Sequence, residues 1–201
     1  MEIINFKKGI LTSICAILLF ACDNSEEFQD NPDYLRDKFN GKYELISSAS
    51  KKAVDLNNDG NASTNLLDEN SMILLSTIEI RIPRVNEIFI ENNEFVFNEI
   101  WPTENEHRLK NKDLIALSKT YNGEYDLYGN TSIGKFKDDL KSGTFRNEIN
   151  NDEKNTLVEL KSIDFLNNDK VEVTLIRKLY TINGWVKTQI KSEYKRFSSN
   201  T

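Results

Sequence analysis

The chain has 201 residues and a formal net charge of −6 at pH 7. An acidic surface repels nucleic-acid phosphates and anionic lipid, so the charge argues against nucleic-acid binding and against broad adhesion to membranes. Cysteine is limited to Cys15 and Cys22, both near the N-terminus, so the rest of the chain must fold as one domain around a core and without disulfides.

The first 21 residues have the pattern of a secretory signal peptide. Lys7 and Lys8 precede an apolar run that ends at Ala21. This run is too short for a spanning helix, which needs about 20 residues, and it fits a signal h-region of roughly 7–15. The segment Leu19-Phe20-Ala21-Cys22 resembles the lipobox of bacterial lipoproteins, which implies cleavage before Cys22 and acylation, palmitate included, of that cysteine. The alternative is an ordinary secretory signal followed by an incidental thiol.

Residues 22–32 are expected to form a flexible acidic tether, since Phe28 is their only large apolar residue. Ser25, Glu26 and Glu27 resemble the acidic export signal that some Gram-negative bacteria use for surface lipoproteins. The resemblance implies a protein that N-terminal lipid on Cys22 anchors to the outer membrane of the cell envelope. The tether leaves two locations open, the periplasmic face and the cell surface.

Residues 33–201 are dominated by alternation of apolar and polar side chains, which is typical of strands with one buried face. Asn31 and Pro32 predict a short helix that runs to Lys38, and Ser63–Glu69 predicts a second helical turn or two. In Met72–Ile82, the side chains of Leu74, Ile78, Ile80 and Ile82 share one predicted buried face. Further strands are predicted at Gly41–Ser48, Glu87–Glu91, Phe95–Trp101, Leu114–Thr120, Thr131–Phe136, Gly143–Glu148 and Leu157–Leu166.

A hairpin is predicted at the C-terminal end of the chain. Lys170–Thr181 and Trp185–Phe197 both alternate, and Asn183-Gly184 between them suits a type I′ turn. The lysines of the second strand face water and would protect an edge if that strand were the last of an open sheet. Short turns between successive strands favour an all-β fold, an antiparallel up-and-down barrel of 8–10 strands with one or two short helices. A β-sandwich is the alternative.

One loop has the spacing of a calcium site. Asp55, Asn57 and Asp59 occupy positions one, three and five, and Gly60 stands at position six, where a calcium loop turns sharply. Asn61 would offer its carbonyl oxygen, and Ser63 would bind directly or through water. Position twelve, normally a bidentate acid, is Leu66, so Asp68 or Glu69 would have to substitute. The alternative is a polar turn in which Asn and Asp side chains bond their own backbone.

Three segments resemble the lipocalin-like domains of small, largely uncharacterised bacterial lipoproteins. They are Gly41–Ser47, Ala53–Leu67 and the hairpin from Leu179 to Tyr194. The resemblance covers about Asp33 to Phe197, although Tyr43 stands where true lipocalins commonly have tryptophan. It implies a barrel fold and leaves the activity open.

The sequence offers little for catalysis. His107 is the only histidine and lies in a charged segment, and the adjacent acids Asp138-Asp139 would point to opposite faces of a strand. There is no glycine-rich phosphate loop and no zinc spacing, so we expect no enzyme, although carboxylates paired from distant strands stay open.

The expected role is therefore non-catalytic binding. The first candidate is a small apolar ligand in the barrel mouth, and the alternative is a structural or accessory subunit of an outer-membrane or surface complex, with a partner protein and a filled barrel. The aromatic residues could line a cavity or fill the core. The residues expected to line a cavity are Leu74, Ile78, Ile80, Val171, Val173, Val186 and Ile190.

Overall fold

The computed structural model describes residues 31–84, 93–104, 125–146, 158–167, 169–181 and 183–199, without the side chains of 103–104 and 125–128. Its elements, in chain order, are α2 (Pro32–Phe39), β1 (Gly41–Val54), β2 (Ser63–Asn65), α3 (Leu66–Glu69), the 3-10 helix η1 (Ser71–Leu75), β3 (Thr77–Arg81), β4 (Glu94–Glu104), β5 (Tyr125–Phe136), β6 (Ser142–Phe145), β7 (Val158–Phe165), β8 (Lys170–Thr181) and β9 (Gly184–Ser198).

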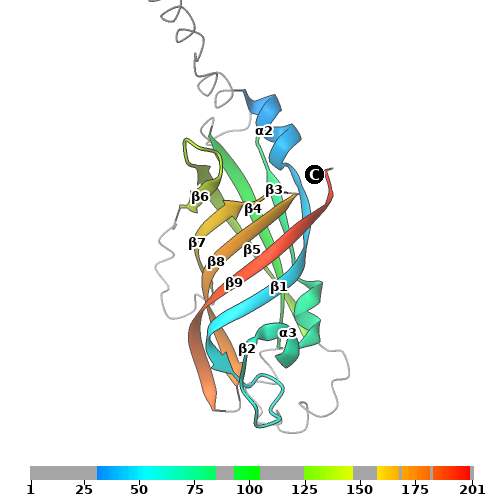
Figure 1. Ribbon diagram of the computed structural model, residues 1–201, viewed down its shortest axis with the longest axis vertical. Helices are drawn as coiled ribbons and strands as arrows, with labels where there is room; N and C mark the ends of the chain where they lie inside the picture. Colours follow the sequence, from blue (N-terminus) through cyan, green and yellow to red (C-terminus); the bar gives the residue numbers. More distant parts are fainter. Residues whose placement is uncertain are drawn as a thin grey trace, which may run out of the picture.

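Eight of the described strands close into an antiparallel barrel (Figure 1). Neighbours follow the chain from β3 to β9, β1 pairs with β3 and with β9, and the short β2 adds to β1 as a ninth strand. The predicted all-β up-and-down barrel is confirmed. β9 is not an edge, because it pairs with β1 from Lys42↔Ser198 to Ser50↔Ile190. Its row of lysines therefore faces water and protects no open edge.

Most predicted elements appear where the alternation placed them, with one clear error. The strand expected from Met72 begins only at Thr77, because Asn70 caps η1 by accepting a hydrogen bond from the Met72 N–H. Leu74 consequently lies on η1, 49% exposed, and lines no barrel interior. The predicted second helix is divided into β2 and α3. The predictions for Glu87–Glu91, Leu114–Thr120 and His107 lie outside the described residues.

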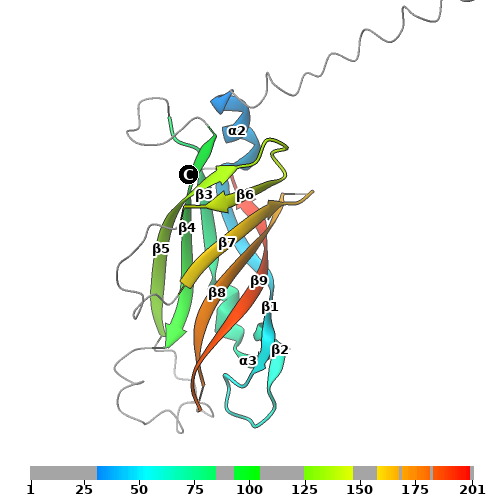
Figure 2. The ribbon, with the colours of Figure 1, turned by 90° about the vertical axis from the view of Figure 1, so that its left-hand side faces the viewer.

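The barrel interior near α2 is filled by aromatic rings. Helix α2 lies at one end of the barrel, which we call the α2 end (Figure 2). Its Leu35 and Phe39 side chains are buried. Ring centroids of neighbouring pairs lie 4.6 to 6.1 Å apart, the spacing of tilted and edge-on aromatic contacts. The rings belong to Phe39, Phe95, Phe97, Phe136, Phe145 and Phe165. The core interpretation of these aromatics holds here.

A bulge in β1 changes which side chains face inward. Leu45 pairs with Tyr194 but Ser47 pairs with Glu193, so Ile46 is an extra residue on β1. Tyr43 and Leu45 point inward before the bulge, and Ser48 and Ser50 do so after it. The interior therefore becomes more polar toward the end of the barrel opposite α2. α3, the end of β8 and the start of β9 lie there (Figure 1), and we call it the α3 end.

Candidate functional site: a buried polar cluster

An ion pair crosses the interior of the barrel. The Nη2 atom of Arg177 on β8 lies 2.7 Å from Oε2 of Glu99 on β4, and the two side chains are only 4% and 1% exposed. Four strand-to-strand steps separate β4 from β8 in either direction around the barrel. The pair therefore joins opposite walls, and little solvent screens it.

Trp101 completes the charged part of the cluster. It follows Glu99 by two residues on β4, so both side chains face the same side of the strand. The guanidinium carbon of Arg177 lies 4.2 Å from the centroid of the Trp101 ring, and the indole is 3% exposed. This is a buried cation–π contact, a class worth about 2 kcal/mol when desolvated.

In the part of the chain that the structure describes, several buried polar atoms of the cluster lack an aligned hydrogen bond. They include both carboxylate oxygens of Glu99 and the Nε and Nη2 atoms of Arg177, despite the short ion-pair distance. Within the described residues, the hydroxyls of Tyr194 and Ser76 are also buried without a hydrogen-bond partner. Such a concentration is unusual, because native proteins pair the large majority of buried polar atoms.

The hydroxyl of Tyr194 is strongly affected by this surrounding. Burial is the main cause that raises its pKa, the charge of Glu99 raises it further, and Arg177 opposes the shift. Ser192 lowers the pKa somewhat, although the two hydroxyls make no aligned hydrogen bond. The Ser192 Oγ instead lies 2.9 Å from the Ser48 Oγ of β1. Tyr194 is thus a neutral, buried donor at the edge of the cluster.

The cluster lies beyond the end of the shortest strand pairing in the described wall of the barrel. β6 pairs with β5 only along Gly134–Phe136 and with β7 only along Ser162–Asp164. Toward the α3 end, Glu99 and Trp101 are paired to Asn130 and Tyr128 of β5, and Arg177 is paired to Val158, the first residue of β7. Between β5 and β7 at this level the described residues contain no further strand. The ion pair therefore links the two walls beyond the reach of β6.

The predicted calcium loop forms a set of side-chain-to-backbone turns. The Asp55 carboxylate accepts hydrogen bonds from the N–H groups of Asp59 (3.2 Å) and Gly60 (3.0 Å). Asn57 Oδ1 accepts from the Asp59 N–H, and Asp59 Oδ1 accepts from the Asn61 N–H. Gly60 has φ of +89°, so the position-six glycine does provide the expected sharp turn.

The loop's remaining candidate ligands are engaged elsewhere or lie close by. Ser63 Oγ accepts a hydrogen bond from the Asn65 N–H, and buried Glu69 accepts one from the Leu56 N–H at 2.9 Å. Of the two substitutes for position twelve, the structure thus brings Glu69 next to the loop. Over the described ranges, no group of three or more His, Cys, Asp or Glu side chains could hold a metal. Calcium binding stays a prediction.

The sites predicted at the N-terminus, Cys22 and the tether before Asn31, lie outside the described residues. None of the helices in the described part of the chain is long and apolar enough to span a membrane. Of the seven residues expected to line a cavity, all except Leu74 face inward, with Val186 half-buried and the others buried.

Sequence reasoning missed the buried cluster, although a signal for it exists. In the alternating pattern, Glu99 falls on the same face of its strand as Phe95, Phe97 and Trp101. Arg177 falls on the same face as Leu175 and Leu179. A charged residue at an inward position needs a partner, so two such positions of opposite sign predict a cross-barrel pair. No protein-family model matches the chain, and no curated protein is similar enough to be a relative.

Proposed function

We propose that this chain is a lipid-anchored cell-envelope protein whose barrel binds a small, predominantly apolar molecule without catalysis. The ligand would enter the α3 half of the interior, because aromatic rings already fill the α2 half. The observation that carries the proposal is the set of buried polar atoms around Arg177 and Trp101 that make no aligned hydrogen bond within the described residues. A buried polar atom that has neither a hydrogen bond nor a charge partner costs about 1–3 kcal/mol. A ligand with one polar group could satisfy several of them at once.

The walls around the cluster suit the apolar part of such a molecule. Ile78, Leu175 and Ile190 are fully buried and face the same interior as the ion pair. Binding sites for small molecules typically combine apolar walls with a few placed polar groups. The barrel fold is compatible with this role and agrees with the lipocalin-like resemblance of the sequence.

Membrane anchoring through acylated Cys22 is part of the same proposal, supported by the lipobox pattern at Leu19–Cys22. A clickable palmitate analogue fed to cells that express the chain should label it, and Cys22→Ala should remove the label. A mature protein whose intact mass contains no acyl chain would refute the anchor.

A second candidate is an accessory subunit of an outer-membrane or surface complex. The observation in its favour is a group of exposed apolar side chains on the outside of the barrel. Leu74 and Leu75 of η1 are 49% and 47% exposed, and Ile100 is 43% exposed. Ile100 pairs with Thr77, two residues after Leu75, so the three side chains belong to one part of the surface. A partner protein could cover this part.

The two candidates separate in one set of measurements. The protein would be extracted from membranes with a mild detergent and analysed by native mass spectrometry for a bound small molecule. Nile red would then be titrated into the protein, and its binding would be followed by the change in Trp101 fluorescence. The Trp185→Phe substitution removes the exposed second indole, so that Trp101 alone is observed. Saturable binding that dodecanol competes away supports the ligand role. No bound molecule and no saturable Nile red binding would reject it, and a stoichiometric co-purified protein would favour the subunit role.

A further inference from the structure

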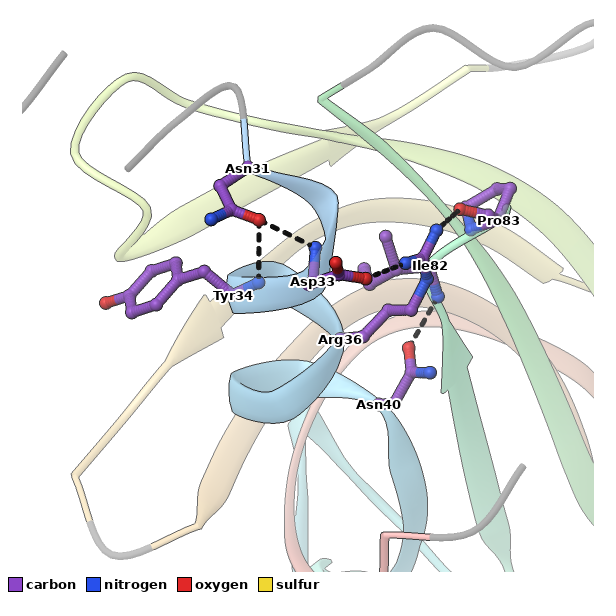
Figure 3. A network of polar contacts seen from close by, with 7 residues as sticks. All are labelled: Asn31, Asp33, Tyr34, Arg36, Asn40, Ile82 and Pro83. Carbon is purple, nitrogen blue, oxygen red and sulfur yellow. Dashed lines mark hydrogen bonds and ion pairs between the residues drawn. The ribbon is translucent and has the colours of Figure 1, made fainter. Parts of the chain in front are cut away.

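The place where the N-terminal tether joins the barrel is fixed by α2. Asn31 caps the helix by accepting hydrogen bonds from the N–H groups of Asp33 and Tyr34 (Figure 3). Leu35 and Phe39 are buried in the core on the barrel side of the helix. The tether therefore ends at the α2 end and nowhere else on the barrel.

Polar contacts on two sides hold α2 in this position. Toward β3, Arg36 donates a hydrogen bond to the Pro83 carbonyl at 2.9 Å, and the Ile82 N–H donates one to Asn40 Oδ1 at 2.6 Å (Figure 3). Toward β9, Arg196 donates to the Lys38 carbonyl at 3.0 Å and to the Asn40 carbonyl at 3.3 Å. These contacts and the burial of Leu35 and Phe39 fix the position of α2 on the barrel.

The tether is short compared with the barrel. About nine residues separate Cys22 from Asn31, which span at most about 30 Å when fully extended and roughly 17 Å on average as a flexible chain. β9 has 15 residues, a strand length of about 50 Å, and a tilt near 40° gives a barrel of roughly 38 Å along its axis. An upright barrel that placed its α3 end on the membrane would hold Asn31 beyond the tether's reach.

We propose that the barrel stands on the membrane with its α2 end toward the lipid and presents its α3 end to the aqueous phase. This inference rests on the proposed acylation of Cys22. In this orientation a ligand or partner binds at the α3 end. The buried cluster, the Asp55 loop and the β8–β9 turn lie toward that end. A molecule that enters there arrives from the water side, so the barrel does not take it directly out of the bilayer that anchors it.

The experiment places one fluorophore at each end of the acylated, full-length mature protein. Lys141→Cys lies in the β5–β6 turn at the α2 end, and Lys187→Cys lies near the start of β9 at the α3 end, where its lysine is 63% exposed. Both sites are exposed, both substitutions remove one lysine, and acylated Cys22 leaves a single free thiol in each variant. The labelled proteins are reconstituted into vesicles of phosphatidylethanolamine and phosphatidylglycerol that carry rhodamine-labelled lipid.

Energy transfer to the lipid should be severalfold larger from position 141 than from position 187, since the two sites differ by roughly 30 Å along the axis. A flexible insertion that doubles the tether should reduce this ratio. Equal transfer from both sites, or more transfer from position 187, would overturn the orientation while the protein still floats with the vesicles. Failure to float, with no acyl chain in the intact mass, would instead remove the anchor and the orientation together.

Discussion

Removing one member of the Glu99–Arg177 pair should destabilise the barrel far more than removing both. Arg177→Met keeps much of the side-chain length but leaves the Glu99 carboxylate buried without a counter-charge, and Glu99→Gln does the same to the guanidinium. With exposures of 1% and 4%, each single variant should lose about 3–5 kcal/mol of unfolding free energy. Arg177→Met also loses the Trp101 contact. The double variant contains no unpaired charge and should lie within about 2 kcal/mol of the natural protein.

Urea unfolding followed by Trp101 fluorescence in a Trp185→Phe background measures all four proteins of this double-mutant cycle. The exposed pair of Lys161 and Glu159 supplies the matched control, and Lys161→Met should change stability by less than about 1 kcal/mol. The reasoning would be refuted if the two single losses simply added in the double variant. Additivity would mean that the charges do not interact across the barrel.

Three further outcomes are expected. Burial raises the pKa of Tyr43 from its ordinary value near 10 to about 12. The unfolded chain therefore loses the Tyr43 proton at a lower pH than the folded protein does. As the pH rises from 10 to 12, the free energy of unfolding should fall by about 2–3 kcal/mol. Tyr43→Phe, which loses only the hydrogen bond to the Phe39 carbonyl, should flatten that part of the unfolding profile; an unchanged slope would contradict the assignment. Gly134→Ala should cost about 1–3 kcal/mol in urea unfolding, because its Cβ would lie 2.1 Å from the Phe95 ring, whereas Gly129→Ala, with open space around it, should cost less. Calcium should raise the melting temperature of the natural protein but not of Asp55→Ala, and no shift in either would leave the loop as a plain turn.

Alternation in the sequence predicts the fold well because a closed antiparallel barrel repeats one local rule in every strand. The apolar inward residues of β8 and β9, such as Val173 and Ile190, follow that rule and were predicted correctly, whereas the inward Arg177 was missed. The rule fails where a local hydrogen bond competes with it. Asn70 caps η1, so Leu74 lies on this 3-10 helix and not on the strand. Whether the cap or the strand forms depends on backbone geometry, which the pattern of apolar residues does not reveal.

The bulge at Ile46 illustrates a second limit. Before it, odd-numbered residues of β1 face inward, and after it even-numbered ones do. The extra residue is set by pairing with β9, which lies far along the chain, so no local pattern in β1 predicts it. The same limit applies to the buried cluster. The strand parity of Glu99 and Arg177 is readable in the sequence, but their meeting requires the order of strands around the barrel.

The cluster has two physical roles that the double variant can separate. As a brace, the ion pair links the β4–β5 wall to the β7–β8 wall where β6 no longer pairs with either. As a binding site, the same atoms would bind the polar group of a ligand. A ligand between Glu99 and Arg177 would increase the distance between them, and theirs is the only ion pair that crosses this stretch of the described residues. If the cluster is a brace alone, the stable double variant keeps every function of the natural protein. If it binds a ligand, that variant folds normally and loses saturable Nile red binding.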